Sequence, residues 1–262
     1  MDAHVAEKVK GGAVEVDPFE LAKARILLTG YHARWADDNY EVLAVEVEFA
    51  TSLENPKTGA VSKTWTLGGK LDAIVRDTRD DRVLIVEHKT SSEDISFGSD
   101  YHRRLRMDGQ VSAYFAGARA LGFAPVGCLY DVIAKPGLRP LKANSRRSVD
   151  ETPDEYAARI AEAIQEDPDK FYVRTEIVRL ESELSEWAVD VWNQAKILRD
   201  VQREEITVRN TDACIRYGST CPYFPVCSGE ASLDDPTKFR RVDQIHPELT
   251  MSTVTPPKEE AK

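Results

Sequence analysis

Asp72, Glu87 and Lys89 are the residues whose types and spacing best fit metal-dependent chemistry. Side chains alternate between the two faces of a strand, so Glu87 and Lys89 point the same way if their segment is extended. If this segment pairs with the one before it, Asp72 approaches the same point. A divalent cation relieves the repulsion between close carboxylates, and a lysine beside it can position or deprotonate water during phosphodiester hydrolysis. The alternative is that Glu87 and Lys89 form a solvated ion pair at a strand edge.

A predicted helix adds polar side chains that could face this point. Gln110 and Tyr114 stand four residues apart, so they share one face of a helix. Arg103 and Arg106 precede them on about the same stripe. The apolar stripe that should pack on the sheet consists of Met107, Val111, Phe115 and Ala118. The alternatives are that Gln110 is a neutral surface residue and Tyr114 a core aromatic.

Strands and helices must position these residues. The apolar patterning predicts strands at Tyr40 to Ala50, Ser62 to Asp77, Arg82 to Lys89, Pro125 to Ala134 and Phe171 to Leu180. It predicts helices at Pro18 to about Ala36, Ser99 to Leu121, Pro153 to Gln165 and Ser182 to about Arg203, the first of them capped by Asp17. This order indicates an α/β protein with a mixed central sheet, in which a helix crosses from the third strand to the fourth.

Three motifs in order give the sequence a family resemblance. They are G-x-x-D from Gly69 to Asp72, apolar-E-x-K-T from Val86 to Thr90, and Q-x-x-x-Y from Gln110 to Tyr114. Together they resemble the RecB-like branch of the PD-(D/E)-x-K nuclease superfamily, which includes phage exonucleases and CRISPR-associated iron–sulfur nucleases. The resemblance implies a restriction-endonuclease-like core, a mixed central sheet flanked by helices, with a C-terminal cysteine-bearing segment.

The resemblance also implies a role for each motif residue. Asp72 and Glu87 would bind the catalytic Mg²⁺ or Mn²⁺, and the backbone carbonyl of His88 would be a further ligand. Lys89 would assist the attacking water. Gln110 and Tyr114 would line the DNA channel near the metal.

Relatives of this kind carry an upstream histidine as another metal ligand. His4 is the first candidate here and His32 the second, although a lone histidine on a helix is more often a surface or core residue. If His4 is the motif residue, the N-terminal helical part is expected to be incomplete. Glu46 is a possible acidic neighbour of the site, with simple alternation along a strand as the alternative.

Three of the four cysteines, Cys214, Cys221 and Cys227, fall within fourteen residues. Clustered cysteines in a reducing compartment are more often metal ligands than disulfides. Relatives with such a trio hold a [4Fe–4S] cluster completed by a fourth cysteine near the N-terminus, but no cysteine precedes Cys128 here. A zinc ion and unligated thiols therefore remain alternatives, and the fourth ligand is not identified. Cys128 itself is expected to pack in the core.

Basic residues gather in two stretches that could contact DNA. Lys135, Arg139, Arg146 and Arg147 occur in a segment without an acidic residue until Asp150, and Arg103 and Arg106 form a second group. Beside a nuclease site such side chains can contact phosphates. The alternative is that the loop is simply a solvated surface.

Length and composition limit the possible classes of protein. The chain has 262 residues, 42% of them hydrophobic and 31% charged, which excludes wholesale disorder and fibrous structure. No apolar run approaches the ~18 residues of a membrane helix, and the N-terminus lacks the apolar centre of a signal peptide, so we expect a cytoplasmic protein without membrane contact. The net charge of −10 argues against charge-driven coating of nucleic acid by the whole surface, but not against a local basic groove.

These observations predict a nuclease core at 1–208, a cysteine segment at 209–234 and a polar tail at 235–262. The expected activity is a Mg²⁺- or Mn²⁺-dependent deoxyribonuclease, an exonuclease acting in recombination, repair or phage replication. Its partners would be DNA, read with little sequence specificity, and a recombination or single-strand-binding protein. The alternatives are a catalytically silent module that binds DNA ends or single strands, and a metal-clamped structural protein unrelated to DNA.

Overall fold

The computed structural model describes residues 16–204, 209–216, 219–242 and 249. The chain divides into two compact units. One unit comprises the described residues up to Phe49 together with Gly68–Leu180. The other comprises Ala50–Leu67 and the described residues from Glu181 onward. None of the described helices is long and apolar enough to cross a membrane.

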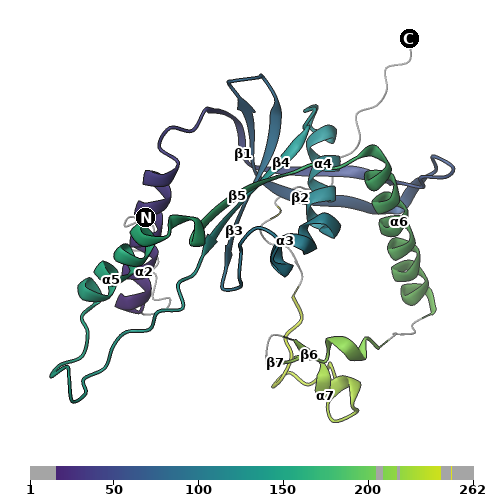
Figure 1. The fold of residues 1–262 in the computed structure, drawn as a ribbon. Coiled ribbons are helices and arrows are strands. Elements are labelled where there is room, and N and C mark those ends of the chain that lie inside the picture. The colour runs from purple at the N-terminus through teal and green to yellow at the C-terminus, as the bar shows by residue number, and fades with distance from the viewer. Residues whose placement is uncertain (1–15, 205–208, 217–218, 243–248, 250–262) are drawn as a thin grey trace. The chain divides into compact units, whose positions relative to one another are not determined.

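A five-stranded mixed sheet organises the fold (Figure 1). Its strands, in spatial order, are β1 (Tyr40–Glu54), β2 (Val61–Asp77), β3 (Val83–Ser91), β4 (Gly127–Ala134) and β5 (Tyr172–Ile177). β3 runs antiparallel to β2 and parallel to β4, and β4 runs antiparallel to β5. The parallel pair requires a crossover, which the helical segment between β3 and β4 provides. The predicted α/β class and mixed sheet are confirmed.

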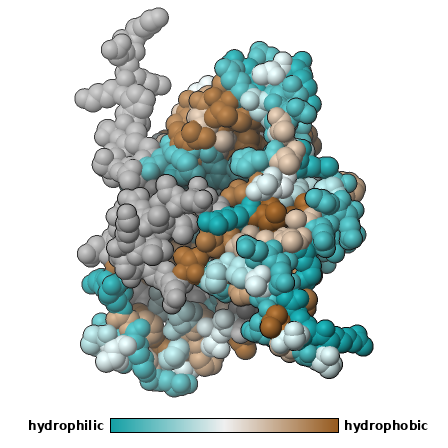
Figure 2. All heavy atoms as spheres, turned by 90° about the vertical axis from the view of Figure 1, so that its left-hand side faces the viewer, coloured by the Kyte–Doolittle hydropathy of each residue, from teal (hydrophilic) through white to brown (hydrophobic). Residues whose placement is uncertain are grey.

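Two long helices pack together beside this sheet. α2 (Pro18–Arg34) begins after Asp17, whose Oδ1 accepts the backbone N–H of Phe19 at 2.9 Å, so the predicted cap is confirmed. α5 (Pro153–Glu166) begins with a capping box formed by Thr152 and Glu155. The cluster that joins the two helices to β5 contains Leu27, Tyr156, Ile160, Ile164, Phe171 and Tyr172. On the side of the molecule that carries these helices, apolar patches lie among polar ones (Figure 2).

The helical segment after β3 differs from the single helix predicted for Ser99 to Leu121. It consists of α3 (Asp100–Arg104), a 3₁₀ turn (Leu105–Met107) and α4 (Gly109–Ala120). The carboxylate of Asp108 caps α4 by accepting the N–H groups of Gln110 and Val111. The buried guanidinium of Arg179 donates to the carbonyls of Leu105 and Asp108, so the break is held by a distant residue.

This break also corrects the predicted apolar stripe. Val111, Phe115 and Ala118 on α4 are fully buried, as predicted. Met107 is 89% exposed, because it lies in the 3₁₀ turn before the helix and does not continue the stripe of α4. The close packing of α4 is visible at Gly117, where a Cβ atom would come within 2.5 Å of the buried Phe49 ring.

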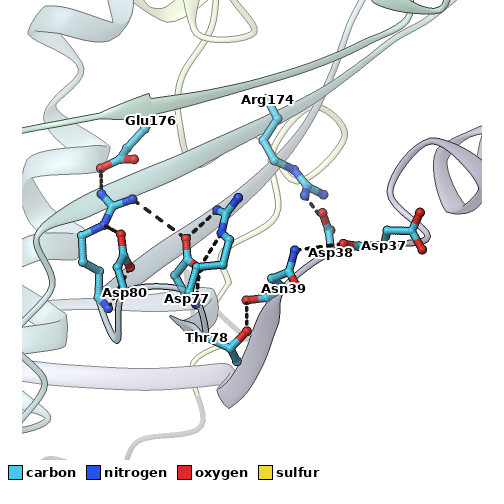
Figure 3. A network of polar contacts seen from close by, with 10 residues as sticks. Asp37, Asp38, Asn39, Asp77, Thr78, Asp80, Arg174 and Glu176 are labelled. Carbon is cyan, nitrogen blue, oxygen red and sulfur yellow. Dashed lines mark hydrogen bonds and ion pairs between the residues drawn. The ribbon is translucent and has the colours of Figure 1, made fainter.

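The turn between β2 and β3 is anchored by a buried carboxylate (Figure 3). Asp77 accepts two hydrogen bonds from the Arg79 guanidinium, at 2.8 and 2.6 Å. These bonds lower the pKa of Asp77 to about 2. Arg82 connects the same turn to β5, because it donates to Glu176 at 2.7 Å. The hairpin that carries the candidate site is therefore fixed at its closed end.

The second unit contains α6 (Glu181–Glu204) and a small cysteine-bearing region. That region consists of a 3₁₀ turn (Thr211–Ala213), the short strands β6 (Ile215–Arg216) and β7 (Ser219–Thr220), and α7 (Phe224–Cys227). β6 and β7 form an antiparallel hairpin. The predicted boundaries of the nuclease core, cysteine segment and tail stay predictions.

Candidate active site

Asp72 and Glu87 lie across from each other on β2 and β3. The antiparallel register places Ala73 opposite Val86, and its continuation by one residue brings Asp72 opposite Glu87. Directly opposed residues on paired strands share a face of the sheet. The backbone N–H of His88 donates to Asp72 Oδ2 at 2.9 Å, which fixes this carboxylate against β3.

Glu87 is an almost fully buried carboxylate whose side chain is 1% exposed. Its Oε1 forms a short ion pair with the ammonium of Lys89, two residues along the same strand. Its Oε2 has no hydrogen-bond partner among the described residues. Burial raises the pKa of Glu87 above its usual value, and the contact with Lys89 opposes that rise. A buried oxygen without a partner is costly, so the site suits a cationic ligand.

The residues present fit a hard divalent cation. Asp72 and Glu87 offer two carboxylates of one face, and the unpartnered Glu87 Oε2 is a free ligand atom. Among the described residues, no three or more His, Cys, Asp or Glu side chains gather in the arrangement of a metal site. Backbone, water and phosphate oxygens are further ligands that such a cation accepts. Mg²⁺ is commonly held in this way, by one or two carboxylates while it keeps several waters.

Gln110 and Tyr114 of α4 stand beside these carboxylates. Gln110 Nε2 donates to the Tyr114 hydroxyl at 2.7 Å, so the two side chains share a face as predicted. Burial raises the pKa of Tyr114 well above its usual range, and the charges of Glu87 and Asp72 raise it further. Tyr114 is therefore protonated at neutral pH, and its hydroxyl remains a hydrogen-bond donor close to Glu87.

The opposite face of β3 carries His88, which lies between two carboxylates. Its Nδ1 is 3.9 Å from Asp72 Oδ2, and its Nε2 is 3.8 Å from Asp131 Oδ2. Parallel pairing places His88 directly beside Asp131 on β4. The hydroxyl of Tyr31 on α2 donates to Asp131 Oδ2 at 2.6 Å and lies 3.4 Å from His88 Nε2. The His88 ring thus links the Asp72 carboxylate to a buried polar cluster.

Arg174 of β5 completes this cluster. Its Nε and Nη2 donate to Asp131 Oδ2 at 2.9 and 2.7 Å, and its Nη1 donates to Asp38 at 2.6 Å (Figure 3 shows the contact with Asp38). The guanidinium also stacks 4.1 Å above the Trp35 ring. Asp131 has a fully buried side chain whose Oδ1 lacks a partner among the described residues.

The cluster around Asp131 was not predicted from the sequence. One signal for it was available, because Asp131 is the only charged residue in the otherwise apolar strand Gly127–Ala134. A charged residue in a buried strand needs a partner. The identity of that partner could not be read from the sequence, since Tyr31 and Arg174 lie 100 and 43 residues away along the chain.

The proposed upstream ligands are not joined to the carboxylate pair in the described structure. His4 lies outside the described residues. His32 is an exposed residue of α2 whose ring contacts that of Tyr31, with 5.8 Å between centroids. Glu46 has a positive φ of 51°. Its carboxylate forms an ion pair with Lys70 at 2.5 Å, and this contact raises the pKa of Lys70. The ligand roles of both histidines stay predictions.

The basic loop after β4 contains two kinds of arginine. Arg147 is engaged internally: it donates to the Val149 carbonyl and forms a short ion pair with Glu155. Arg146 is exposed, and its guanidinium makes no hydrogen bond or ion pair among the described residues. The loop begins at Lys135, whose N–H donates to the Ser91 carbonyl at the end of β3.

The remaining predicted DNA-binding residues are exposed arginines. Arg139 is exposed in the same loop, where its carbonyl accepts a hydrogen bond from Arg159. Arg103 lies 3.5 Å from Asp100 on α3, and Arg106 is exposed in the following 3₁₀ turn. Because the helix breaks at Asp108, these two arginines do not continue the face of Gln110 and Tyr114.

Two cysteines of the trio face each other across a hairpin. Cys221 donates its N–H to the Cys214 carbonyl at 2.8 Å, one step beyond the β6–β7 pairing. Cys227 ends α7 and is exposed. The three thiols are free, and a bound cluster or zinc ion stays a prediction. Cys128 is fully buried on β4, as expected for a core residue.

The family model described as the PD-(D/E)XK nuclease superfamily matches residues 2–228. No curated protein matches the chain. Among solved structures, the crystal structure of SSO0001 is 16% identical, with 80% of this chain and 70% of that chain covered and a TM-score of 0.36.

Proposed function

Because this chain belongs to the PD-(D/E)XK nuclease superfamily, we propose that it is a metal-dependent deoxyribonuclease that hydrolyses phosphodiester bonds. One observation identifies the residues that would perform this reaction. Glu87 is a buried carboxylate with one oxygen bound to Lys89 and the other oxygen unpartnered, opposite Asp72. The arrangement places two carboxylates that can bind a cation next to an amine, that of Lys89, which can donate or accept a proton.

In this proposal Asp72 and Glu87 hold the cation, with the backbone carbonyl of His88 as a further ligand. Bound Mg²⁺ or Mn²⁺ would supply charge neutralisation at the phosphoryl oxygen and lower the pKa of a water. The hydrogen bond from the His88 N–H keeps the Asp72 carboxylate in place across the hairpin. The strands thereby orient both carboxylates before substrate arrives, which reduces the reorganisation needed during reaction.

Lys89 orients the attacking water and neutralises negative charge that develops on the phosphate. Its side chain is one-third exposed, so it can reach a substrate while it still contacts Glu87. Gln110 and the protonated Tyr114 are hydrogen-bond donors on the same side, placed to position the strand. Arg103, Arg106, Lys135, Arg139 and Arg146 are the proposed contacts to backbone phosphates.

The first test is a degradation assay on end-labelled linear DNA and covalently closed circular DNA, with Mg²⁺, Mn²⁺ or EDTA. Replacement Lys89→Ala should lower the cleavage rate roughly 10²- to 10⁴-fold without loss of folding, because general acid–base groups contribute on this scale. Lys23→Ala is the matched control, since Lys23 is a lysine that pairs with a glutamate, Glu20, within α2.

The same assay tests the finer parts of the proposal. Metal-dependent loss of linear but not circular DNA would support an exonuclease, and the retained label would give its polarity. A folded protein that binds DNA but never cleaves it would contradict the enzyme and favour the silent binding module. The proposal also includes a role in recombination, repair or phage replication, membership of the RecB-like branch, and a [4Fe–4S] cluster at the cysteines.

A further inference from the structure

The second compact unit contains a pocket of about 270 Å³ that the nuclease proposal does not use. The first part of β2 forms one wall, and the middle of α6 forms the other. In Figure 1 the hairpin that contains this part of β2 crosses close to α6. All of its lining residues belong to this unit, whereas the Asp72–Glu87 pair belongs to the other.

The pocket combines indole rings with positive charge. Its lining residues include Trp65, Trp192, Lys63, Lys196 and Arg199, and no aspartate or glutamate. The pocket therefore carries three positively charged side chains and no carboxylate, although the chain as a whole has a net charge of −10. Such a lining is complementary to an anionic ligand that contains a flat unsaturated ring.

Regular spacing places these side chains side by side. Trp192, Lys196 and Arg199 occupy positions i, i+4 and i+7 of α6, so they form one stripe along the helix. Lys63 and Trp65 are two residues apart on β2, so they point to the same face of the strand. Each wall of the pocket thus carries one tryptophan with one or two basic residues beside it.

The charged groups of the pocket are available to a ligand. The ammonium groups of Lys63 and Lys196 form no ion pair among the described residues, and both residues are exposed. Arg199 contacts Asp200 at 3.3 Å, but both side chains are about half exposed, with 44% and 54% accessible. Exposed pairs of this kind contribute little, so a phosphate can replace Asp200.

One donor of the wall is also unsatisfied. The indole nitrogen of Trp65 is buried and has no hydrogen-bond partner among the described residues. Buried polar groups without partners cost free energy. A ligand oxygen that reached this nitrogen after a small side-chain adjustment would relieve that cost.

We propose that this pocket binds single-stranded DNA, with a base stacked on Trp192 and the flanking phosphates against Lys63, Lys196 and Arg199. A single strand exposes the faces of its bases, whereas a duplex hides them within its own stack. The inference goes beyond nuclease activity, because it assigns a second nucleic-acid site in a different unit of the chain. Such a site would hold a strand without reading its sequence.

The test measures binding of the full-length protein to a fluorescein-labelled thymidine oligomer by anisotropy, in EDTA. Trp192→Leu should weaken this binding roughly tenfold, because stacking of one base on an aromatic ring has about that effect. The same variant should bind an abasic oligomer and a duplex as the wild type does. Trp187→Leu is the matched control, since Trp187 lies on the same helix but does not line the pocket.

The phosphate contacts are tested by the salt dependence of the same binding. The double variant Lys196→Ala/Arg199→Ala should reduce the slope of log affinity against log salt by about 1.4, or about 0.7 for each lost contact on a single strand. Arg203→Ala, also on α6 but outside the pocket, should leave the slope unchanged.

Several outcomes would overturn the proposal. Unchanged affinity of Trp192→Leu for the thymidine oligomer is one, and an equal loss for the abasic oligomer is another. Equally tight binding of free thymidine monophosphate would make the pocket a mononucleotide site instead. Trp192→Phe should retain the preference for thymidine over the abasic strand, which separates stacking from a folding defect. Without divalent cations no cleavage is measured, so failure of the nuclease proposal leaves this result intact.

Discussion

At the scale of single residues, strand β3 separates two polar environments. Glu87 and Lys89 project from the face that carries Asp72, while His88 projects from the other face toward Asp131. The two environments meet at Asp72, whose carboxylate accepts the His88 N–H and lies near the His88 ring. A displacement of His88 would therefore also displace the Asp72 carboxylate and the His88 backbone carbonyl, two of the groups proposed to hold the cation.

Asp131→Asn should weaken the response to Mg²⁺ while it preserves the shape of the side chain. We expect Asp131 to act as a positioning residue, because its carboxylate accepts hydrogen bonds from Tyr31 and Arg174 beside His88. Substitutions that disturb groups supporting metal ligands cost roughly 10- to 100-fold in metal affinity or activity. The Mg²⁺ concentration at half-maximal cleavage should rise by a factor in this range.

Glu176→Gln provides the matched control for Asp131→Asn. Glu176 is also an acidic residue of a sheet strand paired with an arginine, but its partner Arg82 lies in the turn away from the carboxylate pair. It should leave the Mg²⁺ dependence unchanged. A lower melting temperature for Asp131→Asn with an unaltered Mg²⁺ dependence would assign Asp131 a purely structural role.

At the scale of elements, the position of α4 is constrained by its contact with Phe49 of β1. A Cβ atom on Gly117 would come within 2.5 Å of the Phe49 ring, and one on Gly69 would come within 2.8 Å of the same ring. Phe49 is 1% exposed and cannot simply rotate into solvent. Tyr114 lies one turn before Gly117, so this contact also determines where the tyrosine meets Glu87.

Gly117→Ala should therefore destabilise the protein despite the better helix propensity of alanine. Overpacking costs about 1–3 kcal/mol, whereas the change from glycine to alanine in a helix contributes about 1 kcal/mol. We expect a net loss of about 1 kcal/mol in denaturant unfolding and slower cleavage. Adding Phe49→Leu should restore part of both by making room. A stability gain for Gly117→Ala alone would show that α4 can move without cost.

At the scale of the whole molecule, binding of a polyanion must overcome a net charge of −10. Attraction then depends on local groups of basic residues that are not already neutralised by internal partners. Arg146 and Arg147 are neighbours that differ in this respect. Arg147 is tied to Glu155 and Val149, whereas the Arg146 side chain is exposed and makes no such contact among the described residues.

Arg146→Ala should flatten the salt dependence of duplex binding by about 0.9 in the log–log slope, the value for one lost phosphate contact. Arg147→Ala should alter the slope less and the melting temperature more, because its guanidinium holds the loop to α5. Binding titrations in EDTA from low to moderate salt would measure the slope. An equal reduction for both variants would show that Arg147 leaves Glu155 to contact DNA.

Features that depend on neighbours along the chain could be predicted from the sequence alone. The cap at Asp17, the alternation that places Glu87 and Lys89 on one face, and the spacing of Gln110 and Tyr114 were all predicted and observed. Their cause is the fixed period of strands and helices, which local composition reveals. The motif order of Asp72, Glu87, Lys89, Gln110 and Tyr114 led to the superfamily that the family model shows.

Features that depend on segments far apart in the chain became visible only in the folded structure. At the break before α4, Arg179 donates to the carbonyl of Leu105 from 74 residues away. The cluster around His88 brings Asp131 to Tyr31 across 100 residues. Local pattern cannot show such partners, because a buried charge is satisfied by whichever distant group the fold delivers. The carboxylate pair was therefore readable from the sequence, and the groups that hold it in place were not.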